Sequence, residues 1–434
     1  MHRRPLVRLF LALALTLTSN VLACAPLGER LARTYDIVVP TIRPEPAYED
    51  LFPHYVELCA VTQFRRRDGV WGGIPGHAVM YIKGVCRDPG APYPRLAPCK
   101  SETTDIYDES HGVGVSVNKL FKNVNWVGIP GKRLFLDGDL APDEDLTAQH
   151  YRAMLDEVVE REIFRGIDVH ERYLGEKEPD HTMPEFIAEA SIGTDWALRF
   201  ARTIYCARLP LTEIQAHKLM GYLNAMNVRY FEGEEDYHWN GYHDNCVHLL
   251  VNSLAAAGVW DPVSVQVTKF RQAFNLAVPS NEVINLATLA NLRSLEKPKR
   301  IWRNDQQREG LLEYDWLPMR HGALWKVMPI HQDNEIFDTK VRIMVLNRMF
   351  GRTASKRANE MVTDARFTEL EANLRWWRRR YGAILEEDAG SPPSDPDEYE
   401  VFERRYYDYI ALQHAETDRM LKELGELRRL KGGS

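Results

Sequence analysis

Two segments of this chain place the strongest limits on its fold, because each joins a reactive side chain to the start of a regular element. The segment Gly76-His-Ala-Val-Met-Tyr-Ile-Lys-Gly84 predicts a strand that begins with His77. The segment Asp244-Asn-Cys-Val-His-Leu-Leu-Val251 predicts a helix with Cys246 in its first turn. A thiol at a helix start is made acidic by the helix dipole and by a nearby imidazolium. We therefore expect a fold that brings this strand and this helix together.

The N-terminus has the pattern of an export signal. Residues 1–8 carry three arginines, and a short apolar run at 9–18 follows. Val21-Leu-Ala-Cys24 is similar to a lipobox, whereas Ala23-Cys-Ala25 equally suits ordinary cleavage after Ala25. We expect residues 1–25 to be a signal peptide and the protein to lie in the periplasm or cell envelope, with Cys24 as an alternative lipid anchor. No later segment is long and apolar enough to cross a membrane.

Charge and motif content exclude several classes of function. The formal net charge is −7, and removal of three signal arginines takes it to about −10. An acidic chain is a poor partner for nucleic acid. No glycine-rich phosphate loop is followed by a helix, so we expect no nucleotide and no other cofactor.

The chain has six cysteines, and five remain once Cys24 is lipidated or removed with the signal. An odd number leaves one cysteine without an intramolecular partner in an oxidising compartment. If Cys246 is a working thiol, the other four can form two disulfides. Cys86 and Cys99 are close enough to close a small loop, which leaves Cys59 with Cys206. Four cysteines allow three pairings, and a disulfide that includes Cys246 is the alternative.

Hydrophobic periodicity predicts an α+β fold in which a small antiparallel sheet packs on helices. Strand patterns occupy residues 55–63, 77–85, 112–118, 133–136 and 322–329, and helical spacing begins near residue 143. We divide the chain into the signal (1–25), a linker (26–50), a main domain with helical insertions (51–350) and a helical hairpin (351–434). The hairpin either packs on the main domain or serves as a homodimerising arm. Its last helix has an apolar stripe made of Phe402, Tyr406, Tyr409, Met420, Leu424 and Leu427.

The two central segments also carry a family resemblance. Asn245-Cys-Val-His-Leu-Leu-Val-Asn252 resembles the Asn-Cys-x-His-aromatic-Val-Asn signature of the lecithin:retinol acyltransferase group, with Leu249 at the aromatic position. The His77 segment resembles the histidine strand of that group. Both are features of circularly permuted papain-like proteins of NlpC type, in which the histidine strand precedes the cysteine helix. Residues 193–258 are similar to Lnb-type N-terminal periplasmic domains of bacterial envelope proteins. The resemblance covers about residues 55–260.

The resemblance implies a set of catalytic roles. Cys246 would be the nucleophile, and its own N–H would stabilise the oxyanion. His77 would hold the thiolate as an ion pair and protonate the leaving group. A third polar group must orient the imidazole; we expect Asn118, at the end of a neighbouring strand, with His111 as the alternative. Tyr242 would supply a second oxyanion donor.

These roles predict an exported cysteine hydrolase or acyltransferase that acts on a peptide- or acyl-bearing envelope substrate through a thioester. An amide, such as a cell-wall peptide or an N-acyl group, is our first expectation. A lipid acyltransferase or esterase is the first alternative, and a non-catalytic envelope scaffold is the second. Zinc binding is a further hypothesis, because four potential ligands, His238, His243, Cys246 and His248, fall within eleven residues. Their spacing fits no compact zinc pattern, so we expect no metal.

Overall fold

The computed structural model describes residues 41–42, 45–72, 76–141, 143–241, 244–261, 278–340, 356–387 and 396–431. The expected signal peptide, Cys24 and Tyr242 lie outside these residues. Among the described helices, none combines the length and the apolar character needed to span a bilayer.

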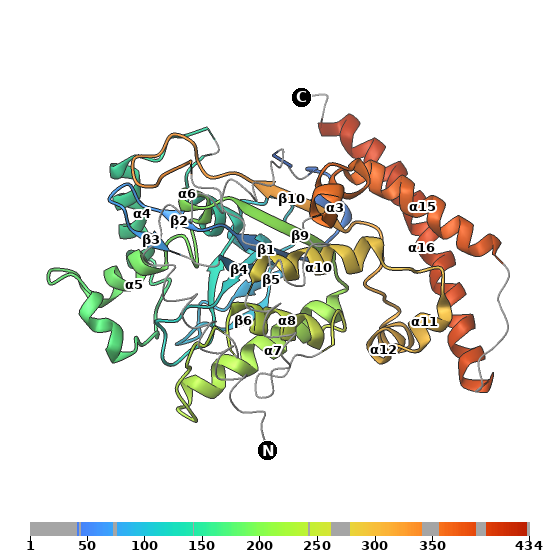
Figure 1. Ribbon diagram of the computed structural model, residues 1–434, viewed down its shortest axis with the longest axis horizontal. Helices are drawn as coiled ribbons and strands as arrows, with labels where there is room; N and C mark the ends of the chain where they lie inside the picture. Colours follow the sequence, from blue (N-terminus) through green and yellow to red (C-terminus); the bar gives the residue numbers. More distant parts are fainter. Residues whose placement is uncertain are drawn as a thin grey trace, which may run out of the picture.

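A six-stranded antiparallel sheet forms the centre of the molecule (Figure 1). Its strands, in spatial order, are β10 (Leu324–Met328), β9 (Ile204–Pro210), β1 (Tyr55–Val61), β4 (His77–Lys83), β7 (Gly112–Ser116) and β8 (Val127–Pro130). Two small hairpins lie beside it, formed by β2 (Phe64–Arg65) with β3 (Trp71–Gly72) and by β5 (Val85–Arg87) with β6 (Leu96–Pro98). The predicted α+β class and antiparallel sheet are confirmed.

Helices cover both faces of the sheet. Along β4, Ala78, Met80 and Ile82 join the core on the side of α7 (Glu213–Phe231), α8 (Cys246–Ala256) and α10 (Pro279–Leu292). Val79 and Tyr81 join the core on the side of α3 (Tyr48–Leu51), α4 (Ala148–Glu160), α5 (Met183–Ser191) and α6 (Leu198–Ala201). This division follows from the alternation of side chains along a strand. Further helices are η2 (Glu109–His111), η3 (Arg133–Asp137), η4 (Glu171–Glu176), α11 (Pro298–Trp302) and α12 (Asp305–Tyr314).

The C-terminal helices pack on the main body. The helix predicted from residue 355 to 387 is interrupted and includes α14 (Ala365–Thr368) and α15 (Leu370–Glu386); α16 (Pro396–Lys431) lies alongside α15 (Figure 1). Trp377 of α15 and Tyr406 of α16 are buried in the same core cluster as the sheet and α8. Most of the predicted apolar stripe of α16 is therefore covered within the chain.

Two predictions at element level are wrong. Residues 133–136 form the helical turn η3, because Leu134, Phe135 and Leu136 are buried in succession and do not alternate. The Phe135 ring lies against the sheet at Gly114, where any side chain would collide with it. The linker predicted to end at residue 50 is also too long, because α3 is packed into the core and the Tyr48 hydroxyl donates to the carbonyl of Gly322 (2.7 Å).

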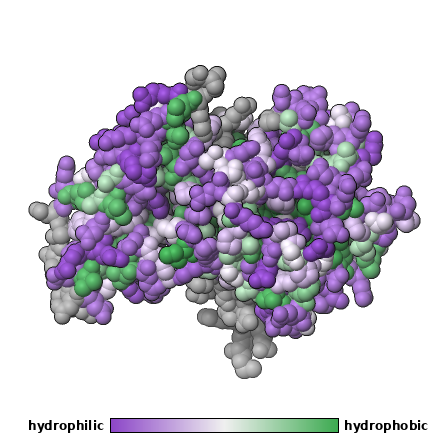
Figure 2. All heavy atoms as spheres, turned by 180° about the vertical axis from the view of Figure 1, so that it is seen from behind, coloured by the Kyte–Doolittle hydropathy of each residue, from purple (hydrophilic) through white to green (hydrophobic). Residues whose placement is uncertain are grey.

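Both expected disulfides are present. Cys59 on β1 pairs with Cys206 directly opposite on β9, and Cys86 pairs with Cys99. Cys246 is the free cysteine of the described residues, and it is buried. On the face seen in Figure 2, hydrophilic residues predominate and hydrophobic residues form small separate patches.

The packing of α7 on α8 depends on one capping glutamine. Thr212 and Gln215 form the predicted capping box of α7, in which Gln215 Oε1 accepts from the Thr212 N–H (2.9 Å). Gln215 Nε2 also donates to the carbonyl of Ala257, at the end of α8 (3.0 Å). The side chain thus connects the start of α7 to the end of the helix that carries Cys246.

We expect Gln215→Ala to lower the free energy of unfolding by about 2–3 kcal/mol, since it removes half of the box and leaves a buried carbonyl unpaired. Thr212→Ala removes only the cap and should lower it by about 1 kcal/mol. Urea denaturation of the two variants measures the difference. Equal losses of unfolding free energy in the two variants would mean that the hydrogen bond from Gln215 to Ala257 contributes nothing to stability.

Candidate active site

Cys246 is the first residue of α8, as predicted. Asn245 caps the helix, and its Oδ1 accepts from the N–H groups of Val247 (2.9 Å) and His248 (3.2 Å). Asparagine is among the best residues at this position because its amide oxygen satisfies free N–H groups of the first turn. The cap thereby fixes the start of α8 and with it the place of the sulfur.

Three backbone N–H groups lower the pKa of the Cys246 thiol, those of Cys246 itself, of Val247 and of Ala78 on β4. Because α8 packs against β4, the sulfur lies near the end of the sheet where β4 begins. Burial raises the pKa of the Cys246 thiol to about 11, against the opposing effect of the three N–H groups and of Arg202. This direction is opposite to the acidic thiol that the sequence predicts, because the effect of burial exceeds that of the helix start.

His77 begins β4, and its ring is held by a serine. Nε2 lies 2.8 Å from the Ser116 hydroxyl, which donates its proton to the carbonyl of Thr194 (2.9 Å). Because a hydroxyl has one proton, Ser116 accepts from Nε2–H, and Nδ1 carries the free lone pair. Burial, together with the charge of Arg202, lowers the pKa of His77 to about 3, so the ring is neutral.

His77 and Cys246 reach the same end of the sheet but do not hydrogen-bond to each other. By strand alternation the ring lies on the side of Val79, whereas the cysteine belongs to the core on the α7–α8 side. The ring is hydrogen-bonded to Ser116. The two side chains form no ion pair in this structure, and burial favours the neutral form of both groups.

The predicted orienting residues have other partners. Asn118 Nδ2 donates to Asp195 Oδ2 (2.8 Å), so Ser116, and not Asn118, contacts the His77 ring. His111 lies at the opposite end of β7, where it contacts Glu49. The prediction for Tyr242 falls outside the described residues.

One buried charged residue in this region, Arg202, was not predicted from the sequence. It stands between α6 and β9 and is fully buried. Its charge acts on His77, Cys246 and Asp195. Burial also raises the pKa of Asp195 to about 6, against the hydrogen bond from Asn118. An arginine just before a predicted strand resembles many surface arginines in sequence, so no local signal reveals its burial.

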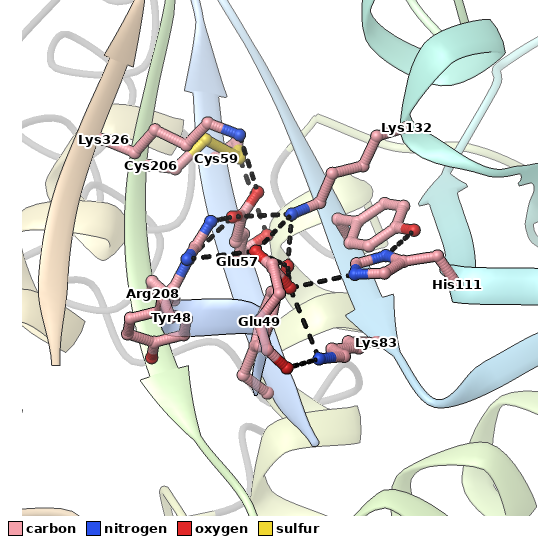
Figure 3. A network of polar contacts seen from close by, with 12 residues as sticks. Tyr48, Glu49, Glu57, Cys59, Lys83, His111, Lys132, Cys206, Arg208 and Lys326 are labelled. Atoms are coloured by element: carbon pink, nitrogen blue, oxygen red, sulfur yellow. Dashed lines mark hydrogen bonds and ion pairs between the residues drawn. A yellow bond between two sulfur atoms is a disulfide. The ribbon is translucent and has the colours of Figure 1, made fainter. Parts of the chain in front are cut away.

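A larger charge network lies at the other end of the sheet (Figure 3). Glu57 on β1 accepts from Arg208 Nε (2.8 Å) and from Lys132 Nζ (3.2 Å), and Lys326 lies 3.5 Å from its second oxygen. Glu49 on α3 accepts from His111 Nε2 (2.9 Å) and also pairs with Lys83, Lys132 and Arg208. Four cations thus surround two carboxylates.

The charges of this network indicate that it has a structural role. Although burial alone would raise it, the pKa of Glu57 is held far below its usual range by Arg208 and Lys132. Burial lowers the pKa of Lys132 to about 7. The charged side chains come from five separate strands or helices and from the β8–η3 turn, and they find partners among themselves. We therefore place the candidate site at the Cys246 end and not here.

The zinc hypothesis finds no converging ligands among the described residues. The His248 ring contacts its own cap, Nδ1 to Asn245 Oδ1 (3.0 Å), and His238 stacks on His170. The third histidine, His243, is outside the described residues. Glu57, Cys59 and Cys206 do lie close enough together to share an ion, but both sulfurs are in a disulfide.

Comparison with known proteins adds no assignment: the chain matches no protein-family model, no curated protein and no solved structure.

Proposed function

We propose that this protein is a cysteine hydrolase or acyltransferase with a permuted papain-like core, in which Cys246 forms a thioester and His77 is the base. One observation carries the proposal. The free thiol of the described residues stands at a helix start beside the strand that begins with a histidine, and nearby backbone N–H groups oppose the effect of burial on its pKa. Preorganised N–H groups of this kind stabilise negative charge on sulfur and on an oxyanion beside it.

The chemistry would start from the neutral pair. The lone pair on His77 Nδ1 takes the thiol proton while the sulfur attacks the carbonyl carbon, and the N–H of Cys246 donates to the oxyanion. The proton then passes from Nδ1 to the leaving amine or alcohol, which departs and leaves a thioester. Water or an acceptor amine attacks the thioester and regenerates the thiol. In this structure Nδ1 is not within hydrogen-bond reach of the sulfur, so the sequence requires the His77 ring to leave Ser116 and turn toward Cys246 on substrate binding.

The two disulfides are typical of proteins oxidised outside the cytoplasm, which supports an exported enzyme. We propose an amide in a cell-wall peptide or an N-acyl group as the substrate. The reaction product would distinguish cleavage of such an amide from ester cleavage and from acyl transfer between lipids.

A non-catalytic envelope scaffold is the second candidate, and a specific observation favours it. Cys246 is only 5% exposed, its pKa is raised, and it does not contact His77. Free cysteine is commonly an inert buried residue.

Reaction with an activated acyl ester, followed by mass spectrometry, separates the two candidates. We expect an acyl adduct on Cys246 of the folded wild type, because the proposed enzyme forms a thioester there. His77→Ala should slow acylation by at least about 100-fold through loss of the base. Ser116→Ala should slow it less, since it frees the ring without removing it.

His217→Ala is the matched control, because His217 is an exposed histidine on α7. It should acylate at the wild-type rate. A folded wild-type protein that remains unacylated, or one in which His77→Ala reacts as fast as His217→Ala, would contradict the enzyme and support the scaffold.

A further inference from the structure

A surface pocket of about 540 Å³ lies between the end of α10 and one side of α15. One wall comes from residues 291–296, at the end of α10 and just after it, and the other from residues 376–380 of α15. This volume is within the range of ligand sites in proteins. None of the residues in these walls belongs to the Cys246 site or to the network around Glu57, so the pocket needs an explanation of its own.

Arg380 joins the two walls. Its Nη1 donates to the carbonyl of Asn291 (3.2 Å), its Nη2 to the carbonyl of Arg293 (2.7 Å), and its Nε to the carboxylate of Glu296. Glu296 also accepts from the Ser294 hydroxyl (2.9 Å). Although burial alone would raise the pKa of Glu296, Arg380 lowers it to about 2, so this carboxylate stays ionised and paired. The pocket is therefore preformed, and the carboxylate in its lining needs no further cation.

Two other groups in the lining differ from Arg380 and Glu296, because they lack partners among the described residues. Arg379 is exposed and forms no ion pair within 4.0 Å. Asn291 is 2% exposed; its Nδ2 donates to the carbonyl of Ala287 (3.1 Å), whereas its Oδ1 is buried and unpaired. A buried acceptor without a donor is destabilising. The lining therefore favours a ligand that brings a hydroxyl donor together with negative charge.

The surface around the pocket is basic, although the chain as a whole has a formal net charge of −7. Residues 291–303 include five cationic side chains and one acidic one, and residues 376–380 include three arginines and no acid. In the described part of the chain, five exposed members of this set form no ion pair within 4.0 Å: Arg293, Lys297, Arg300, Arg303 and Arg379. Cations gathered in this way attract an anionic partner.

The apolar side chains of this surface do not suit insertion into a membrane. Leu292 is the exposed large hydrophobic residue of the two segments, and Trp376 is half-buried against Phe367 and Arg366. A surface that enters a bilayer presents a continuous apolar face. An acidic saccharide fits the pocket better, because its carboxylate can pair with an arginine and its hydroxyls can donate to a free acceptor.

We propose that this pocket binds one unit of an acidic polysaccharide, and that the exposed cations around it hold neighbouring units of the same polymer. Arg379 pairs with the carboxylate of the unit in the pocket, and Asn291 Oδ1 accepts from one of its hydroxyls. The site goes beyond the proposed reaction and does not depend on it.

Calorimetric titration of the full chain with polygalacturonate at low salt tests the proposal. We expect the wild type to bind this polymer and not dextran, which is neutral, and we expect binding to weaken as salt screens the charges. Arg379→Gln should weaken binding by at least about tenfold, the effect of losing one hydrogen bond to a charged group. Because Arg379 is exposed, the variant should keep the thermal unfolding midpoint of the wild type.

Arg378→Gln is the matched control, because this adjacent arginine of α15 is already paired with Asp418 (2.6 Å). It removes the same charge and should change the affinity by less than about twofold. Equal losses of affinity in the two variants would overturn the proposed pocket in favour of general charge attraction. Absence of binding to polygalacturonate at low salt would also overturn it. Binding to phosphatidylglycerol vesicles in place of the polymer would make the surface a membrane contact and would likewise contradict the proposal.

Discussion

Glu57→Gln is expected to lower the free energy of unfolding by about 3–5 kcal/mol, the range for removing one partner of a buried ion pair. Glu57 is fully buried, and it is the shared acceptor of Arg208, Lys132 and Lys326. Without its charge, Arg208 and Lys132 retain Glu49 as a paired carboxylate, and Lys326 loses its ion pair. Guanidinium denaturation of the variant and the wild type measures the loss.

The loss should depend on pH in a defined direction. The folded pKa of Glu57 is depressed, so the unfolded chain binds the extra proton and the wild type loses stability as pH falls below about 4. The difference in the free energy of unfolding between the wild type and Glu57→Gln should therefore become smaller as the pH falls.

Glu371→Gln is the control, because Glu371 pairs with Arg375 and Arg428 at the surface. This substitution should lower the free energy of unfolding by less than about 1 kcal/mol. Equal losses in the two variants would show that the buried network contributes no more than surface pairs do.

Removal of the Cys59–Cys206 disulfide is expected to destabilise the protein by about 5 kcal/mol, through the entropy of an unfolded loop that spans 147 residues. The Cys86–Cys99 disulfide closes a span of 13 residues and should contribute about 3 kcal/mol. Both are compared as double alanine variants, so that no orphan thiol remains to pair with Cys246. Urea denaturation should give the larger shift for the first pair, and the reverse order would contradict the loop argument.

The sequence predicted the parts of this fold that depend on local pattern. The alternating strand at 112–118, the capped helix after Thr212 and the helix that begins at Cys246 all occur where periodicity and capping residues place them. The observed disulfide pairing is one of three that the sequence allowed, and the short separation of Cys86 from Cys99 favoured it. The strand and the two helices could be predicted because a few neighbouring residues determine each of them.

The site was harder to predict because its contacts join distant segments. Asn118 was expected beside His77, yet β7 ends at Ser116, and it is the serine that meets the ring. Arg202 becomes buried only when α6 and β9 close over it. The network around Glu57 had one usable signal, since Glu57, Lys83, Arg208 and Lys326 each stand inside an apolar strand.

The disulfide pairing is nested, because the Cys86–Cys99 loop lies within the span from Cys59 to Cys206. A chain that emerges N-terminus first into an oxidising compartment presents Cys59 and Cys86 long before Cys206. Pairing in order of appearance would join Cys59 to Cys86 and Cys99 to Cys206, so both disulfides would be wrong. For a chain exported in this way, the native pairing would be reached from that misbridged form by thiol–disulfide exchange.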